Sequence, residues 1–352
     1  MNWDQKIVGP EALGAYQDDP ADSSLETRVA ALIDQQHEVW PSLREGYDAF
    51  AQVETKPVQV NEAEVVIQHN PRRIRSTSAS VDKTIIGNRR CFLCPESLPE
   101  EEKGIAYGDD LVILCNPFPI LDRHLSIVHR DHRPQQIEGN LDGMLSLARD
   151  LGSSYFVSYN GPECGASAPD HLHFQACSRE LLPIEQKLFE DEPVMAEDCA
   201  YCEDTARNSF ELFTLGGIGR SVVVFRGGNR EELAHWVYKV IDELAEHTGK
   251  SEPLLNIICT YDPKLWTVYL FPRARHRPAS FYAEGNERLI VSPGAIDMAG
   301  VVVVPERQHY DKIDGEVMSR IFSEVSLSGE LVNDLIDGIC ALPDAEEYGG
   351  ES

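Results

Sequence analysis

The chain has 352 residues, 42% of them hydrophobic, which is enough for two or three domain-sized units with a substantial core. Its formal net charge is −28, from 59 acidic and 31 basic residues, and a field of that sign argues against nonspecific nucleic-acid binding. There is no apolar run of membrane-spanning length and no secretion-signal pattern, and nine cysteines do not suggest a disulfide framework, so we expect a cytoplasmic protein.

The apolar periodicity predicts the elements of the first half of the chain. Residues 24–55 are predicted to be largely helical, and Val65–Gln68 to be a short strand that ends at an Asn-Pro turn. After Cys91 the expected order is strand, strand, helix, strand, loop and strand. Strands are expected over residues 111–115, 124–128, 155–159 and 171–176, and the helix over residues 140–151.

The same order returns in the second half of the chain. Strands are expected over 210–215 and 220–225, a helix over 233–246, strands over 254–260 and 265–271, and helix again over 315–339. The recurrence indicates a duplicated α+β unit in which residues 265–271 correspond to 171–176. The predicted parts are an N-terminal extension (1–85), a first unit (86–195), a second, degenerate unit that lacks the histidines (205–310) and a helical tail (311–352).

Two cysteines and two histidines of the first unit fit a metal site. Cys91 and Cys94 in CFLC have the two-residue gap that lets both thiolates bind one tetrahedral ion. His132 in RDHRP and His171 complete a Cys2His2 set. We therefore predict a structural Zn²⁺ ion, the alternative being two buried thiols and two core histidines.

The stretch HLHFQA carries polar side chains at alternate positions. On a strand His171, His173 and Gln175 point the same way, and the residues between them point into a core. With His171 assigned to the metal, His173 is left as a nucleophile toward phosphorus. The loop from Asn160 to Ser167 can turn backbone N–H groups toward an anion. The Gln175 amide can donate to a phosphoryl oxygen but cannot protonate a leaving group.

The HLHFQ motif resembles the H-x-H-x-Q signature of the transferase branch of the histidine-triad superfamily. That branch includes galactose-1-phosphate uridylyltransferase, diadenosine tetraphosphate phosphorylase and GDP-hexose phosphorylase. CFLC and RDH are similar to the zinc-site elements of the uridylyltransferases, and NGPECGASAPD to the loop before the motif in dinucleotide phosphorylases. LPIE, YLFPR and SPGAIDMAGVVVVP resemble GDP-hexose phosphorylases, so the likeness in motif order runs from Gln68 to Arg307.

The resemblance implies a fold and a reaction. The fold is α+β, with two histidine-triad-like repeats, each an antiparallel sheet with flanking helices, as in galactose-1-phosphate uridylyltransferase. The second histidine of the motif, His173, would take the nucleotidyl group, with Gln175 beside it. We therefore predict a nucleotidyltransferase or phosphorylase that acts on a nucleotide sugar of the GDP-hexose type or on a dinucleoside polyphosphate. Phosphate or a sugar phosphate would be the second substrate.

Six further residues are predicted to bind the substrate. They are Asn160, Gly161, Ser167, Asn116, Arg72 and Arg273. The first three belong to the loop before the motif. The resemblance places Asn116 near the ribose and the Asn-Pro segment that contains Arg72 near the nucleotide. The guanidinium groups of Arg72, with its neighbours Arg73 and Arg75, match phosphate oxygens, the alternative being a solvated basic turn. Arg273 and Arg275 could reach the phosphates or the sugar.

The motif also bears on two alternative functions. A nucleotide hydrolase of the same superfamily is disfavoured by the glutamine in the motif, and a nucleotide-binding protein without turnover by the presence of both His173 and Gln175. A second C-x-x-C, Cys199 and Cys202, has no evident histidine partner and is interpreted as reduced thiols. No nucleic-acid or membrane partner is expected, and pairing of chains as a homodimer stays open.

Overall fold

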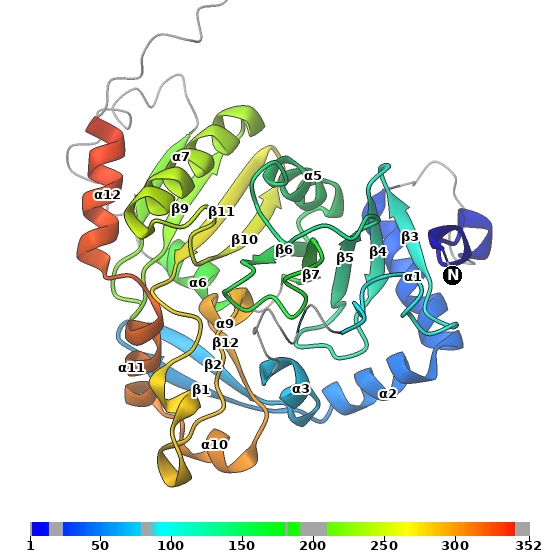
Figure 1. Cartoon of the computed structure of the whole chain (residues 1–352), viewed down its shortest axis with the longest axis horizontal. Coiled ribbons are helices and arrows are strands. Elements are labelled where there is room, and N and C mark those ends of the chain that lie inside the picture. The colour runs from blue at the N-terminus through cyan, green and yellow to red at the C-terminus, as the bar shows by residue number, and fades with distance from the viewer. Residues whose placement is uncertain are drawn as a thin grey trace, which may run out of the picture.

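A nine-stranded antiparallel sheet, in the order β3-β4-β5-β7-β6-β10-β11-β9-β8, forms the centre of the computed structural model (Figure 1). The structure describes residues 2–13, 24–78, 86, 89–179, 182–190 and 210–341. The strands are β3 (Gly104–Tyr107), β4 (Leu111–Cys115), β5 (Leu125–His129), β6 (Tyr155–Asn160), β7 (His173–Ser178), β8 (Glu211–Thr214), β9 (Val223–Gly227), β10 (Leu255–Asp262) and β11 (Leu265–Pro272).

The order of the strands is symmetric about the central pair β6 and β10. Outward from this pair, β7, β5 and β4 on one side correspond to β11, β9 and β8 on the other, and β3 is an additional edge strand beyond β4. Helix α5 (Leu141–Leu151) connects β5 to β6, and α7 (Arg230–Thr248) connects β9 to β10, so the helices correspond as well. This topology confirms the predicted duplication and the correspondence of β11 with β7. The two units share one continuous sheet because β6 pairs with β10 from Asn160↔Asn256 to Phe156↔Thr260.

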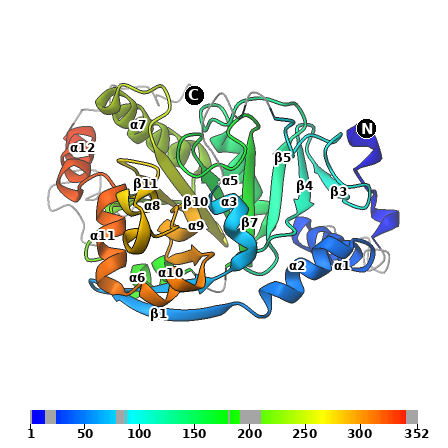
Figure 2. The same cartoon turned by 60° about the horizontal axis from the view of Figure 1, so that its bottom comes forward.

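Each face of the large sheet is covered by a different set of elements (Figure 2). One core lies against α5, α7, α1 (Leu25–Val39), α2 (Pro41–Phe50) and α12 (Gly329–Ala341). The opposite core lies against α6 (Pro183–Glu190), α9 (Ala295–Met298), α10 (Arg307–Lys312), α11 (Gly315–Val325) and a second sheet. Because both faces are packed, the central strands are buried along most of their length, and their sequences are mostly continuous apolar runs.

The second sheet joins a segment of the N-terminal part of the chain to a segment near residue 300. It has three strands in the order β1-β2-β12, formed by β1 (Glu54–Val60), β2 (Ala63–His69) and β12 (Val301–Val304). Strands β1 and β2 are an antiparallel hairpin, whereas β12 pairs with β2 in parallel, from Val301↔Val66 to Val304↔His69. Residues that the sequence assigned to the second unit therefore complete a sheet begun by the N-terminal extension. The boundaries of the four predicted parts stay a prediction.

Two predicted helical stretches are each divided in the structure. Residues 24–55 form α1 and α2, which meet at Pro41, and β1 already begins at Glu54. Proline disfavours helical backbone in the preceding residue, and Trp40 is extended with φ −110° and ψ 100°. Residues 315–339 form α11 and α12, which are separated by Ser326–Ser328. No helix in the described ranges is long and apolar enough to cross a membrane.

The packing of α2 against the loop between β4 and β5 gives a stability prediction. A Cβ atom at Gly46 would overlap the carbonyl oxygen of Pro117. We expect Gly46→Ala to destabilise the protein by about 1–3 kcal/mol, the usual cost of overpacking. In the matched control Gly143→Ala, also within a helix, the added methyl group meets nothing within 4 Å. That variant should gain about 0.5–1 kcal/mol in urea unfolding, and equal effects of the two substitutions would contradict this packing.

Candidate active site

The four predicted metal ligands come together in the structure. One ligand atom from each of Cys91, Cys94, His132 and His171 lies within 4.8 Å of the others. The Sγ atom of Cys91 is 3.3 Å from Nδ1 of His171, and Sγ of Cys94 is 3.3 Å from Nδ1 of His132. This Cys2His2 cluster could hold a metal ion, and its donor set is the one that structural zinc sites use. The second C-x-x-C motif lies outside the described residues.

Contacts around the cluster orient both imidazole rings. The Nε2–H of His171 donates to the carbonyl oxygen of His129 at 2.7 Å, which leaves Nδ1 directed at the thiols. His132 Nε2 is 3.7 Å from a carboxylate oxygen of Asp170, which in turn accepts from Arg89 at 3.1 Å. Such outer contacts fix the tautomer of a ligating histidine. The chemistry and the orientation of the four groups therefore fit a tetrahedral cation.

The strand that carries the motif is shorter than predicted. Strand β7 begins at His173, so His171 does not share a strand face with His173 and Gln175. Pairing with β5 ends at His173↔Val128, and the next N–H, that of Leu172, donates instead to the carbonyl oxygen of Arg133. The chain turns away from the sheet at that point, and this turn brings the His171 ring to the cysteines.

His173 is buried and held in one tautomer. Its side chain is 4% exposed, and its Nδ1 lies 2.8 Å from the carbonyl oxygen of His171. A carbonyl only accepts, so Nδ1 carries the proton and Nε2 keeps a lone pair. Burial lowers the pKa of His173 to about 4, which keeps the ring neutral near pH 7. The site therefore presents an unprotonated imidazole nitrogen.

Gln135 fixes the backbone at His173. Its Oε1 accepts from the N–H of His173 at 2.8 Å, and its Nε2 donates to the carbonyl oxygens of His173 and Asn160 at 3.0 and 2.9 Å. The side chain is 2% exposed. It thus joins the start of β7 to the end of β6, where the loop begins. The sequence analysis missed this residue, since a glutamine in a loop carries no motif.

Gln175 is oriented by His124. The sequence analysis gave this histidine no role beyond the first position of a predicted strand. Nδ1 of His124 accepts from the N–H of Ile120 at 3.2 Å. Its Nε2 therefore carries the proton and donates to Oε1 of Gln175 at 2.9 Å. The amide nitrogen of Gln175 is left to point into the neighbouring cavity. Burial lowers the pKa of His124 to about 3, so this arrangement holds at neutral pH.

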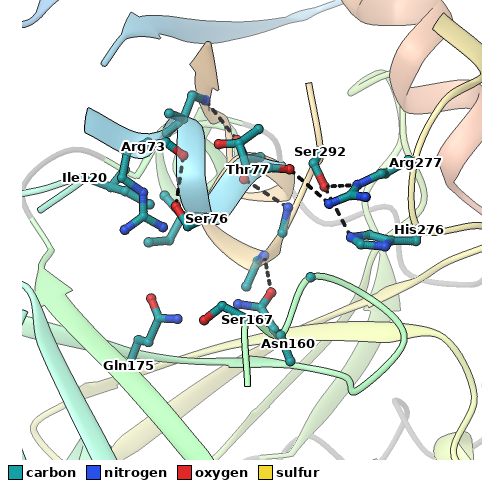
Figure 3. A pocket seen from close by; sticks show the side chains of 17 residues that line it. Arg73, Ser76, Thr77, Ile120, Asn160, Ser167, Gln175, His276, Arg277 and Ser292 are labelled. Atoms are coloured by element: carbon teal, nitrogen blue, oxygen red, sulfur yellow. Dashed lines mark hydrogen bonds between the residues drawn. The ribbon is translucent and has the colours of Figure 1, made fainter. Parts of the chain in front are cut away.

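The cavity beside Gln175 is built from three separate parts of the chain (Figure 3). Asn160, Ser167 and Gln175 from the first unit face Arg73 and Ser76 from the segment at α3 (Ile74–Thr77). The third side is formed by residues 276–277 and 292–297. The space measures about 60 Å³, which suits a phosphoryl group or a few water molecules rather than a whole nucleotide.

Cationic groups gather at this cavity in an otherwise acidic protein. Arg277 donates through Nε to Oγ of Ser292 at 2.9 Å and through Nη2 to the carbonyl oxygen of Thr77 at 3.0 Å. Arg73 lies across the cavity, and its Nε makes no hydrogen bond within the described residues. The carboxylate present, Asp297, accepts from two backbone N–H groups, and burial raises its pKa to about 6. The arrangement favours an anionic ligand.

The predicted substrate-binding residues divide into two groups. Asn160 and Ser167 line the cavity, and Gly161 is adjacent, where a side chain would press on the carbonyl oxygen of Leu255. The other three are absent from the lining. Asn116 bonds to Ser126, and Arg72 is exposed and 3.8 Å from Glu45.

Arg273 has contacts that the sequence did not indicate. The side chain is 1% exposed and donates to the carbonyl oxygens of Val325, Pro293, Arg275 and His276, and to Oδ1 of Asn256. It therefore stabilises the backbone behind the cavity. The guanidinium groups at the cavity wall are those of Arg73, which the sequence analysis named beside Arg72, and of Arg277, which it did not name.

The two halves of the chain resemble known families in sequence, and most of the chain resembles a known structure in fold. Residues 203–345 match the family described as GDPGP1-like, C-terminal domain, and residues 32–178 match a domain of unknown function, DUF4922. No curated protein matches the chain in sequence. The structure of yeast Ap4A phosphorylase Apa2 in complex with AMP is similar, at 15% identity and a TM-score of 0.54 over 82% of this chain and 97% of that one. Apa2 in complex with Ap4A gives the same identity and score over 85% and 97%.

The chain shares its fold with yeast Ap4A phosphorylase Apa2, which confirms the predicted α+β fold class. Membership of the transferase branch stays a prediction.

The buried, neutral His124 gives a pH prediction. In the unfolded chain a histidine titrates near pH 6.5, whereas the folded pKa is about 3. Between these values the unfolded state binds the extra proton, so stability that is present above pH 6.5 is lost as the pH falls. We expect the free energy of unfolding of the wild type to fall more steeply than that of His124→Gln, by up to about 1.4 kcal/mol per pH unit. Urea unfolding from pH 7 to 4 measures this, and equal slopes would contradict the buried neutral ring.

Proposed function

We propose that the protein is a nucleotidyltransferase or phosphorylase that works through a covalent nucleotidyl-histidine at His173. The substrate would be a nucleotide sugar or a dinucleoside polyphosphate, and phosphate or a sugar phosphate the acceptor. The observation that carries the proposal is the neutral Nε2 of His173, one strand step from the Gln175 amide at a cavity lined by Arg73 and Arg277. The fold shared with a phosphorylase of Ap4A supports the same class.

The reaction divides into two displacements at phosphorus. Nε2 of His173 attacks the α-phosphorus, a phosphorus–nitrogen bond forms, and the bond to the leaving phosphate or sugar phosphate oxygen breaks. An oxygen of the acceptor then attacks the same phosphorus and the phosphorus–nitrogen bond breaks. The ring becomes positively charged when Nε2 is substituted, and the Nδ1–H bond to the His171 carbonyl stabilises that charge. The proton on Nδ1 stays in place throughout.

The surrounding groups bind the phosphoryl oxygens. The amide nitrogen of Gln175, held by His124, donates to a nonbridging oxygen, and the guanidinium groups of Arg73 and Arg277 balance its charge. Glutamine has no acidic proton to give to a leaving group, which favours leaving groups that are already weak bases, such as phosphates. The cavity accommodates the phosphoryl group, and the nucleoside would extend out of it.

We assign a structural Zn²⁺ ion to Cys91, Cys94, His132 and His171. The bound ion would neutralise two thiolates and fix the turn before β7. His171 connects this turn to the chemistry, because its ring faces the thiols while its carbonyl oxygen accepts from Nδ1 of His173. The metal site thus aims the nucleophile without contacting substrate.

A single labelling experiment separates this proposal from its alternatives. The protein would be incubated with a panel of nucleotide sugars and dinucleotides carrying a radiolabelled α-phosphate, with and without inorganic phosphate. Acid-labile label on the protein, released as nucleoside diphosphate by phosphate, supports the transferase. Turnover to monophosphate in water alone would support a hydrolase. Reversible binding without label would support a binding protein.

The nucleophile is tested by His173→Gly. We expect loss of covalent labelling and of transfer, with metal content and fold retained, because the glycine removes the imidazole to which we assign the attack. Added imidazole should restore part of the turnover by filling the space. Gln175→Ala should keep the label and lose about 10²–10³ in rate, the usual cost of one phosphate donor. Near-normal transfer by His173→Gly without imidazole would rule out the covalent mechanism.

The metal site is tested by elemental analysis and thermal unfolding. We expect about one zinc per chain in the wild type, as for a single tetrahedral site. Cys91→Ser and His171→Ala should each lower the zinc content and the Tm, since one ligand of a folding-coupled site is lost. Cys340→Ser, which changes a thiol on α12 outside the cluster, is the control and should keep both. Unchanged zinc content and Tm in Cys91→Ser would contradict the assignment.

A further inference from the structure

A second cleft lies in the degenerate unit and shares no residue with the cavity at Gln175. It measures about 380 Å³, within the roughly 300–1,000 Å³ of small-molecule sites. One wall is the glycine-rich loop between β8 and β9, and the other is the junction of α11 with α12. The lining comprises residues 214–222, 323, 326–329 and 332–333. Neither the fold comparison nor the proposed reaction gives this cleft a role.

The N-terminus of α12 opens into this cleft. The helix has 13 residues, and Ser328 caps it by accepting from the N–H of Leu331 at 3.3 Å. The first N–H groups of a helix have no acceptor within it, and they carry the positive end of the helix dipole. A Cβ atom at Gly329 or at Gly216, on the facing loop, would meet nothing within 4 Å. The space in front of the helix is therefore open to a ligand.

Ser326 adds an unpartnered hydroxyl group to the same cleft. Its side chain lines the cleft and is 7% exposed, yet its Oγ has no hydrogen-bond partner in the part of the chain that the structure describes. A buried hydroxyl without a partner costs free energy, and a ligand with an acceptor oxygen would satisfy it. Thr214 and Asn333 supply further polar groups and are bonded to each other at 3.0 Å.

Arg220 brings a buried positive charge to the cleft wall. It is 7% exposed and donates to the carbonyl oxygens of Met298 and Ile218, while its guanidinium lies 4.5 Å from the ring centre of Phe322. Within the described residues no carboxylate pairs with it, and Nη2 makes no hydrogen bond. Burial alone lowers its pKa, to about 9. A buried cation without a counter-charge is costly, and an anion beside it would offset that cost.

We propose that this cleft binds a phosphoryl group, either free phosphate or the phosphate of a small phosphorylated molecule, between the N-terminus of α12, Ser326 and Arg220. Helix N–H groups, a hydroxyl donor and a guanidinium are the groups that recognise phosphate in proteins. The acidic side chains near the loop do not close the site. The carboxylate of Glu62 lies against Gly217 of the loop and is 3.4 Å from Lys187, which balances its charge. Neither Glu62 nor Glu330 belongs to the lining.

The proposal is tested by equilibrium dialysis of the full-length protein with radiolabelled inorganic phosphate and, separately, with glucose 1-phosphate. Asn333→Asp places a negative charge in the cleft and should weaken binding at this site by about tenfold or more. The neutral control Asn333→Ala should have a smaller effect. Ser326→Ala should also weaken binding by about tenfold, since a hydrogen bond to a charged ligand is lost, while the Tm stays the same or rises because an unsatisfied group is removed.

The two anions distinguish the source of the phosphoryl group. Binding of both at the responsive site indicates a phosphate pocket, and binding of glucose 1-phosphate alone indicates a phosphorylated metabolite; both results support the site. Arg73→Gln changes the cavity at Gln175 and should leave anion binding in the second cleft unchanged. The test of this cleft is therefore independent of the test of the proposed reaction. The proposal would be overturned if folded Asn333→Asp and Ser326→Ala proteins bound both anions as the wild type does. It would also be overturned if the wild type bound neither anion, or if Arg73→Gln abolished all of the binding.

Discussion

The hydrogen bond from Nδ1 of His173 to the carbonyl oxygen of His171 is the contact on which the site depends. It sets the tautomer, and with it the position of the lone pair on Nε2 that would attack phosphorus. The carbonyl is in place because the chain leaves the sheet at Leu172 and the His171 ring turns to the cysteines. Gln135 holds the same turn from the other side, through the backbone of His173. The cluster, the turn and the nucleophile are therefore one structural unit.

The duplicated units differ in what covers the corresponding face of the sheet. In the first unit His173 and Gln175 project from β7 toward the side of α9 and the small sheet. There Gln175 lines the cavity and bonds to His124, whereas His173 is buried and bonds to the carbonyl oxygen of His171. In the second unit β11 presents Tyr269 and Phe271 to that side, and they are buried in the apolar core with Phe322 of α11. Imidazole and amide groups there would lack partners. Packing thus accounts for the presence of the histidine motif in one unit of the sheet.

The cavity beside Gln175 exists because distant segments are joined by buried polar contacts. Oδ1 of Asn160 accepts from Asn256 on the neighbouring strand and from the N–H of Ala295 at the start of α9, both at 2.8 Å. Arg273 donates to the carbonyl oxygen of Pro293, just before that helix, and to that of Val325, after it in the chain. Arg220 donates to Met298 at the other end of α9, so the helix lies between the cavity and the second cleft. A helix of four residues is stable there because its neighbours supply these bonds.

The sequence alone determined the strands, the duplication and the Cys2His2 set, because these follow from short-range patterns: apolar periodicity, repeated element order and ligand spacing. It also singled out Gln175, which lines the cavity. It could not place His171 off the strand, because the turn before His173 is set by contacts with the distant residues Arg133, Gln135 and Cys91. Nor could it select His124, Gln135, Arg73 and Arg277 over Arg72 and Arg273. Whether a guanidinium or an imidazole faces a cavity or a backbone carbonyl is decided by segments far apart in the chain, and only their packing in three dimensions sets which polar groups remain free to meet a ligand.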